Sequence, residues 1–326
     1  MIGIRHDEKG VALLTVLLLV ATVSVVAIGM TQAVTRATNR SFAAGLRDQA
    51  YWAIYGIEGA AIDYLRENAA QLGQPNTPLF QEPLILPSAD GTATLRFSER
   101  SNCFNINNLV NKDADDERYV VDAGAADAFA ILVRELGASQ ATGSILAMRI
   151  ADFIDSNNQP EISSAEDFDY QRRKVPYRTA ARFLASVSEL RAVAGFSRDV
   201  YRGLLPYLCA LPNDGPQKLN VNTLTPEDAP LLVAASLGTI NRALAVRVIE
   251  SRPVTGYKAV EDFQSMAQLS NIELPENFSD SLAVESGLIA MELILEGSVG
   301  RLRQESLIER GADVKVLERR FGERLP

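Results

Sequence analysis

An acidic stretch at residues 152–169 carries the side chains of this 326-residue chain that are best suited to bind a metal ion. Counted from Asp155, oxygen-bearing side chains fall at positions 1, 3, 5, 7 and 12 of a calcium-binding loop of the EF-hand type: Asp155, Asn157, Gln159, Glu161 and Glu166. A carboxylate at position 12 can bind calcium through both oxygens. Pro160 stands at position 6, where an EF-hand turns through glycine. The pattern therefore favours an irregular calcium loop over a true EF-hand.

The candidate calcium ligands are five carboxylates and one amide: Asp152, Asp155, Asn157, Glu161, Glu166 and Asp167. Two other interpretations stay open. The acids could form a solvated loop whose charge is balanced by the basic residues at 172–174. Asp152 and Glu166 could also act as the general acid and base of an enzyme.

A second pattern begins at Leu219-Asn220-Val221-Asn222-Thr223 and continues through residues 245–252 to 257–263. It resembles a helix–hairpin–helix unit, which elsewhere grips DNA phosphates with backbone amides and helix N-termini. The turn at 237–240 stands where the hairpin belongs. DNA binding requires a basic surface, whereas this chain has a formal net charge of −9 and few basic residues near the pattern. A small helical packing unit is the favoured interpretation.

The element that positions everything else is an apolar helix near the N-terminus. No charged residue occurs from Val11 to Met30, and about 20 apolar residues rising about 1.5 Å each cross the hydrocarbon core of a bilayer. A charged leader, residues 1–10, ends in glycine directly before this run. Such a leader is typical of type IV pilin and pseudopilin precursors, so Gly10 and Val11 are the predicted cleavage site. A plain single-pass anchor and a secretory signal are the alternatives.

Thr15 becomes the fifth residue of the chain if cleavage falls after Gly10. Most pilin-like proteins carry glutamate there, and its carboxylate neutralises the N-terminal amine of a neighbouring subunit, because an unpaired buried charge is costly. Threonine cannot neutralise an amine. This predicts a position in the filament where no neighbouring amine has to be met, unless Thr15 is simply a polar residue in a membrane helix.

Histidine and cysteine are scarce. The only histidine, His6, lies in the predicted leader, so the processed chain would lack Ser-His-Asp catalysis, Cys-His catalysis and histidine metal sites. Two cysteines, Cys103 and Cys209, are too few for a cysteine-rich zinc site. An even pair after a membrane helix indicates an oxidising compartment and one disulfide, with two buried thiols as the alternative.

The rest of the chain reads as a pilin-like domain interrupted by helices. A continuous helix is predicted from residue 11 to about 72, a proline-rich loop at 74–90 and a strand at 92–98. Helices are then predicted at 125–136, 144–154, 188–193, 197–205, 226–237 and 243–250, and strands at 288–295, 300–309 and 314–321. This order predicts an α+β fold: a long transmembrane and amphipathic helix, an antiparallel pilin-like sheet and a large inserted, mostly helical domain.

The predicted boundaries follow from that order. They are a cleaved leader at 1–10, a transmembrane helix at 11–30, the first part of the pilin-like domain at 31–108, the inserted domain at 109–280 and the second part of the pilin-like domain at 281–326.

Several stretches in order make the whole chain resemble the K-type large minor pseudopilins of type II (general) secretion. They are residues 10–15, Phe104-Asn105-Ile106-Asn107-Asn108-Leu109, 151–155, 165–167, 176–178, 188–190, 204–206 and 219–223. The resemblance implies a non-enzymatic subunit that forms the tip of the pseudopilus and assists export of folded proteins across the outer membrane. It also implies calcium in the helical domain.

The implied partners are the I-type and J-type minor pseudopilins, the major pseudopilin, the prepilin peptidase, the inner-membrane secretion platform and secreted proteins, with no nucleic acid. The implied location is the bacterial inner membrane, crossed once, with most of the chain in the periplasm. A membrane-anchored DNA-binding pseudopilin is the alternative function, because of the helix–hairpin–helix pattern.

Overall fold

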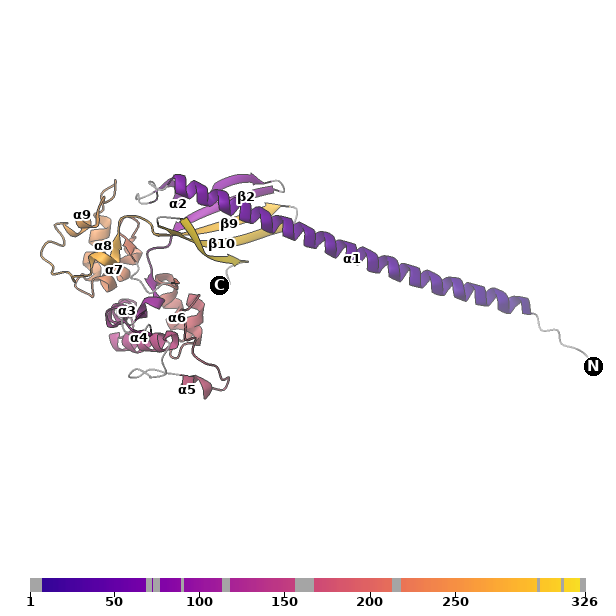
Figure 1. The fold of residues 1–326 in the computed structure, drawn as a ribbon, viewed down its shortest axis with the longest axis horizontal. Helices are drawn as coiled ribbons and strands as arrows, with labels where there is room; N and C mark the ends of the chain where they lie inside the picture. Colours follow the sequence, from indigo (N-terminus) through magenta and orange to yellow (C-terminus); the bar gives the residue numbers. More distant parts are fainter. Residues whose placement is uncertain are drawn as a thin grey trace, which may run out of the picture.

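The computed structural model describes residues 8–68, 72, 77–88, 91–112, 118–155, 167–212, 218–297, 300–311 and 314–322. Two bodies make up the globular part: a five-stranded sheet covered by one long helix, and a region of short helices (Figure 1). The sheet is antiparallel and the helical region is inserted between two of its strands. The predicted α+β fold is therefore confirmed.

Helix α1 (Glu8–Glu67) runs for 60 residues, and only its last part lies across the sheet, while the first part projects away from it (Figure 1). Residues at helical spacing turn one face of this last part into the core: Ala50, Ile54, Ala61 and Leu65. The predicted end at residue 72 is wrong by one turn. The Asn68 side-chain amide donates to the Tyr64 carbonyl at 2.9 Å and occupies an acceptor at the end of the helix.

The sheet has the strand order β1-β2-β9-β10-β11, with bounds β1 (Leu84–Ser88), β2 (Gly91–Glu99), β9 (Leu288–Gly297), β10 (Gly300–Arg310) and β11 (Val314–Phe321). The four strands predicted from period-two patterns are confirmed as β2 and β9–β11. The predicted loop at 74–90 is wrong in part, because it contains α2 (Pro78–Gln81) and β1. Strand β1 is an edge strand, where Pro87 costs no ladder hydrogen bond to a second neighbour.

A buried carboxylate links α1 to the two strands at one edge of the sheet, β10 and β11. Glu58, on α1, is 1% exposed and accepts hydrogen bonds from Gln304 at 2.7 Å and from Ser306 at 2.6 Å, both on β10. Arg319 on β11 pairs with its other oxygen at 2.7 Å. Because a buried charge is tolerated only when it is paired and hydrogen-bonded, this network fixes where α1 crosses the sheet.

The chain leaves the sheet after β2 and returns at β9, and these two strands pair directly, with Glu99 opposite Ile289. The Glu99 carboxylate, at the end of β2, links this strand to the segment just before β9 and to the second half of the helical region. It accepts from the Asn220 amide and the Thr223 hydroxyl at 3.1 Å each, and from the Ser286 hydroxyl. The buried Ser101 hydroxyl accepts from the backbone N–H groups of Gly287 and Leu288 at 3.0 Å each. We call this group of hydrogen bonds the Glu99 clamp.

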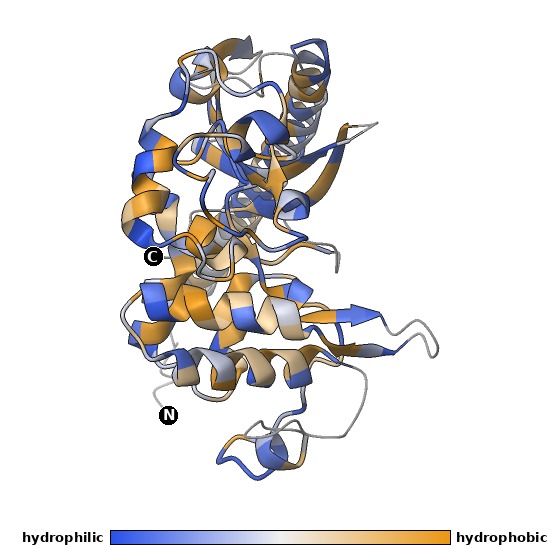
Figure 2. Ribbon diagram, turned by 90° about the vertical axis from the view of Figure 1, so that its left-hand side faces the viewer, coloured by the Kyte–Doolittle hydropathy of each residue, from blue (hydrophilic) through white to orange (hydrophobic). Residues whose placement is uncertain are grey.

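The helical region has its own core, separate from that beneath α1. Its main helices are α3 (Ala123–Glu135), α4 (Gln140–Ile154), α6 (Arg198–Leu204), α7 (Ala229–Ala235) and α8 (Arg242–Glu250). Figure 2 shows hydrophobic and hydrophilic residues alternating along them, as expected for helices buried on one face. The helix predicted at 188–193 is a 3₁₀ helix, Val187–Ala192, and the short helices α5 (Asp167–Gln171) and α9 (Val260–Gln264) were not predicted.

The two halves of the helical region share one plan, which is built on a buried asparagine. In the first half, Asn107 bonds both backbone groups of Leu184 at 2.9 Å and the carbonyl of Leu211 at 2.7 Å. In the second, Asn222 bonds both backbone groups of Tyr257, at 2.9 and 2.7 Å, and the carbonyl of Val284 at 2.9 Å.

A short parallel strand pair accompanies each of these asparagines, β3 (Phe104–Asn105) with β6 (Leu208–Cys209) and β7 (Leu219–Asn220) with β8 (Leu282–Ala283). A helical hairpin follows in each half, α3–α4 in the first and α7–α8 in the second. The helical region is therefore a structural repeat.

We expect Glu99→Ala to lower the free energy of unfolding by about 2–4 kcal/mol, because it leaves several donors of the Glu99 clamp without an acceptor. Urea unfolding of the purified chain measures the loss. Glu296→Ala is the matched control, since its exposed ion pair with Arg301, at 3.6 Å, is expected to contribute less than about 0.5 kcal/mol. Equal stability of the two variants would contradict a clamping role for Glu99.

Candidate functional sites: membrane helix, acidic loop and helical hairpins

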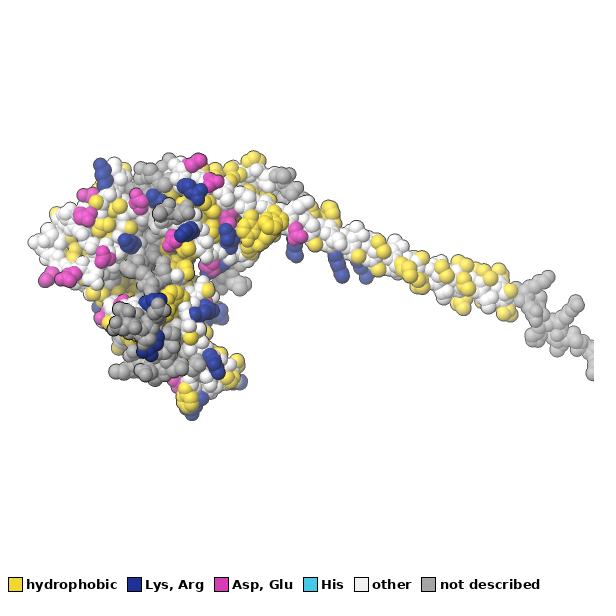
Figure 3. Space-filling view, viewed as in Figure 1, with side chains coloured by type: hydrophobic (Ala, Val, Ile, Leu, Met, Phe, Trp, Pro, Cys, Tyr) yellow, Lys and Arg dark blue, Asp and Glu magenta, His cyan; other side chains and the backbone are white. Residues whose placement is uncertain are grey.

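The first part of α1 is the only described helix that is long and apolar enough to cross a membrane. Its apolar side chains face outward with no protein around them, and Val11, Leu14 and Leu18 are 65%, 70% and 68% exposed. Figure 3 shows this stretch as a mainly hydrophobic and uncharged rod beyond the globular part. The arrangement is consistent with a single-pass anchor.

The predicted processing site and filament-core residue lie in this helix. Gly10 and Val11 are part of α1, whereas residues 1–7 of the predicted leader lie outside the described residues. The Thr15 hydroxyl donates to the Ala12 carbonyl at 2.9 Å. Its polar group is thus satisfied within the helix, as membrane-spanning threonines require, and it brings no charge. Cleavage after Gly10 stays a prediction.

Two of the six predicted calcium ligands stand at the end of α4 and are buried. Asp152 is 1% exposed and Asp155, which caps the helix, is 2% exposed. Asn157, Glu161 and Glu166 lie outside the described residues, as does the side chain of Asp167. Among the described residues, no three of His, Cys, Asp and Glu come together as a metal site. The calcium site and the pairing of Asp152 with Glu166 both stay untested.

The disulfide between Cys103 and Cys209 is confirmed, with the two Cα atoms 5.7 Å apart. Cys103 lies just after the Glu99 clamp, and Cys209 ends β6 in the first half of the helical region. Both cysteines are buried with Leu211 and Leu288, at the junction of the sheet with the helical region. The bond therefore closes the first half of the helical region at the point where the chain leaves the sheet.

The helical hairpins contact one another. In the second hairpin, Leu237 and Gly238 have φ of 50° and 79°, as the turn between α7 and α8 requires. Arg242, at the start of α8, donates to the Glu135 carbonyl at the end of α3 at 2.9 Å. A Cβ on Gly238 would come within 3.5 Å of the Arg134 guanidinium. In DNA-binding proteins with a helix–hairpin–helix unit, the corresponding turn binds phosphate. Here the turn between α7 and α8 packs against the end of α3 in the first half of the helical region.

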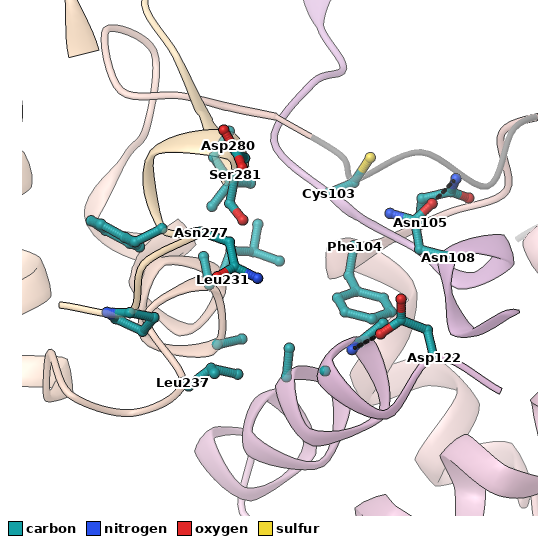
Figure 4. A pocket seen from close by; sticks show the side chains of 18 residues that line it. Cys103, Phe104, Asn105, Asn108, Asp122, Leu231, Leu237, Asn277, Asp280 and Ser281 are labelled. Atoms are coloured by element: carbon teal, nitrogen blue, oxygen red, sulfur yellow. Dashed lines mark hydrogen bonds between the residues drawn. The ribbon is translucent and has the colours of Figure 1, made fainter. Parts of the chain in front are cut away.

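A cavity of about 330 Å³ lies between the two halves of the helical region (Figure 4). Phe104, Asn108 and Asp122 line one side, and Asn277 and Asp280 are on the other. Asp122 is the N-cap of α3 and accepts from the Ala125 N–H at 2.8 Å. This acid therefore has a structural role at the start of α3.

A surface that the sequence did not reveal lies where α1 enters the globular part. It consists of four aromatic residues in mutual contact, Tyr51, Trp52, Tyr55 and Phe321, and we call it the aromatic surface. Trp52 is the only tryptophan of the chain and is 69% exposed. The helical pattern of α1 places Trp52 on the side away from the buried residues, and this could have indicated an exposed aromatic residue from the sequence. The contacts with Phe321 depend on the fold.

Comparisons with known proteins agree with this architecture. Two family models described as "Type II secretion system (T2SS), protein K" match residues 102–213 and 219–285, which correspond to the two halves of the helical region. A type II secretion system protein K of Pectobacterium carotovorum is 33% identical, with 98% of each chain covered. That of Klebsiella pneumoniae is 32% identical, again with 98% of each chain covered.

A solved structure is also similar over most of the chain. A chain in the crystal structure of the GspK-GspI-GspJ complex from enterotoxigenic Escherichia coli superimposes with a TM-score of 0.71 and 25% sequence identity. The match covers 87% of this chain and all of that one. Sequence similarity, domain matches and fold agree, and the chain belongs to the type II secretion system protein K family.

Proposed function

We propose that this chain is a non-enzymatic minor pseudopilin that forms the tip of a periplasmic filament together with I-type and J-type minor pseudopilins. In this role it assists the export of folded proteins across the outer membrane. The observation that carries the proposal is the helical region, which lies at the end of the globular part away from the membrane helix (Figure 1). If every subunit carried such a helical region, it would clash with the subunits of the next layer of a helical filament. The region is therefore tolerated only at the distal end, where no further subunit is added.

The absence of charge at Thr15 supports the same position by a separate argument. A subunit in the shaft must neutralise the N-terminal amine of a neighbour within an apolar filament core, where an unpaired charge is costly. Thr15 bonds its own helix and offers no carboxylate. A subunit at the distal end has no such amine to meet.

The tip assignment predicts low copy number. In filaments purified from cells that express the whole secretion system, we expect this chain once per filament, at one end, and in a complex with the I-type and J-type subunits. Quantitative mass spectrometry against the major pseudopilin measures the ratio, and immunogold labelling measures the position. Repeated labelling along the shaft would refute the tip position, and failure to co-purify with either minor subunit would refute the complex.

We also propose that a prepilin peptidase removes residues 1–10 and that the rest of α1 remains anchored in the inner membrane, near the secretion platform and the major pseudopilin. Intact-mass analysis of membrane-extracted protein should give an N-terminus at Val11. A mass that retains the leader, or one that has lost the apolar segment up to Met30, would be incompatible with a pseudopilin.

Calcium is proposed as a structural ligand of the acidic stretch. The buried carboxylates of Asp152 and Asp155 immediately precede the other candidates, and all six candidate ligands are the hard oxygen donors that calcium prefers. These residues fit the ion. Calcium bound there would neutralise a dense set of carboxylates.

Calcium should raise the melting temperature of the purified chain and chelation should lower it, because a ligand that binds only the folded state stabilises it by mass action. Differential scanning calorimetry with calcium or with EGTA measures the shift. Glu166→Ala should reduce the shift strongly. Asp199→Ala, outside the stretch, is the control and should leave it unchanged. If Glu166→Ala responds to calcium like the unmodified chain, the ion is bound elsewhere.

A further inference from the structure

One segment of the helical region has the opposite charge from the rest of the chain. Residues 172–202 contain eight arginines and lysines and only two acids, Glu189 and Asp199. This segment therefore has a formal charge of +6, and because the whole chain has −9, the remainder has −15. All eight basic residues are exposed, and we call them the basic surface: Arg172, Arg173, Lys174, Arg178, Arg182, Arg191, Arg198 and Arg202.

The elements that carry the basic surface are joined to one another. The Tyr177 hydroxyl donates to the Ala192 carbonyl at 2.6 Å, and the Tyr170 hydroxyl accepts from the Ala194 N–H at 3.1 Å. These two bonds hold α5 and the segment after it against the 3₁₀ helix Val187–Ala192, on which α6 also packs. Figure 3 shows Lys and Arg side chains over the end of the helical region that contains α5. The basic residues therefore lie on adjoining elements and form one surface.

The positive charges of this surface are mostly not neutralised within the chain. Among the described residues, Arg182 is the only one of the eight with an ion pair, which it makes with Glu189 at 3.1 Å. Like charges that lie close together repel one another and destabilise the folded state. The electrostatic energy of the basic surface therefore falls when a partner with negative groups approaches it.

Seven of the eight basic residues are arginine, which favours a protein as the partner. A guanidinium can bind both oxygens of a carboxylate, and arginine is enriched at protein interfaces whereas lysine is depleted. Arg173 lies 4.6 Å from the Tyr170 ring centroid and donates to the Tyr177 hydroxyl at 2.5 Å. Arg182 donates to the Phe183 carbonyl at 2.7 Å. Guanidinium groups that are already held lose less conformational entropy when a partner binds.

Exposed apolar side chains accompany these charges. Phe168 is 67% exposed, Val175 is 74% exposed, and the Arg172 guanidinium lies 5.0 Å from the Phe168 ring centroid. Protein interfaces combine apolar contacts with charged groups, whereas nucleic acid is bound mainly through its phosphates. The inner membrane is distant, because the helical region lies at the far end of the globular part from the apolar stretch of α1 (Figure 1). The mixture therefore fits a folded protein with an acidic patch.

We propose that the basic surface is the site at which the filament tip binds a folded protein that is to be exported, through a patch of carboxylates on that protein. This inference rests on the proposed function, because at the tip no further subunit covers the helical region. The remainder of the chain, with its charge of −15, repels an acidic partner. Screening over about 8 Å at physiological ionic strength keeps the attraction local to the basic surface. The surface thus selects acidic proteins and determines where they bind.

Charge reversal in the full chain tests the site. Lys174→Glu combined with Arg178→Glu replaces two exposed cations that have no hydrogen bond or ion pair of their side chains among the described residues. The matched control is Lys218→Glu combined with Arg247→Glu, which changes the total charge equally but in the second half of the helical region. Both double variants should keep the melting temperature of the unmodified chain, because all four side chains are exposed.

Export is measured in cells that express the whole secretion system. The proteins to follow are those that no longer reach the culture medium when the gene for this chain is deleted. We expect the Lys174→Glu and Arg178→Glu variant to lower their export by about tenfold, as loss of complementary charge at an interface would do. The control variant should export them normally.

Binding is measured with one of these exported proteins, purified from the medium, and the full chain in detergent. The dissociation constant should rise by about tenfold for the Lys174→Glu and Arg178→Glu variant. For the unmodified chain, the affinity should fall between about 50 and 300 mM NaCl, because salt screens exposed charges. Replacing acids of the bound patch on the exported protein by lysine should restore binding to the variant, which a folding defect would not allow.

The outcomes separate the two levels of inference. If export does not depend on this chain, or if the chain fails to assemble with the other minor subunits, the proposed function fails and the binding site fails with it. If export depends on the chain but the Lys174→Glu and Arg178→Glu variant exports and binds as well as the unmodified chain, the proposed function stands and the basic surface is not the site. Binding to phosphatidylglycerol vesicles or to duplex DNA, with none to the exported protein, would also overturn the proposal.

Discussion

The structure depends on one topological constraint: two strands that pair directly, β2 and β9, are separated in the chain by the whole helical region. An insertion between paired strands is compatible with the sheet only if its two ends are held at the strand spacing. The Glu99 clamp does this, because it joins the end of β2 to residues just before β9 and to Asn220 in the middle of the insertion. Just beyond the clamp, the Cys103–Cys209 disulfide closes the first half of the insertion covalently. A loop closed over 106 residues removes much entropy from the unfolded chain.

The same constraint explains how the insertion is built. A long insertion that starts and ends at one point must return to that point, and here it does so in two similar units, each closed by a buried asparagine. Asn107 and Asn222 are nearly inaccessible, and each satisfies backbone groups of two separate segments. An amide side chain can donate and accept hydrogen bonds at the same time. One asparagine can therefore join two backbone segments that would otherwise need a strand between them. The asparagine motifs that mark the family in the sequence are thus explained by backbone hydrogen bonding.

Elements governed by local pattern could be predicted from the sequence, and elements governed by distant contacts could not. The long helix, strand β2, the three C-terminal strands and the main helices follow from periodicity. Strand β1 does not follow from the sequence, because Pro83 and Pro87 indicate a loop and only its place at the sheet edge allows it to be a strand. The pairing of Cys103 with Cys209 could be predicted because no other cysteine exists. The aromatic surface could not, since Phe321 reaches Tyr51 only after the sheet forms.

Helix α1 has different surroundings along its 60 residues, and its sequence changes accordingly. The first stretch is apolar on all sides, which suits lipid, where no face is distinguished. The last stretch buries one face on the sheet and includes Glu58, a charge that lipid would not tolerate but that the sheet pairs completely. The opposite face of that last stretch keeps glycines and exposed aromatic side chains that neither lipid nor sheet requires.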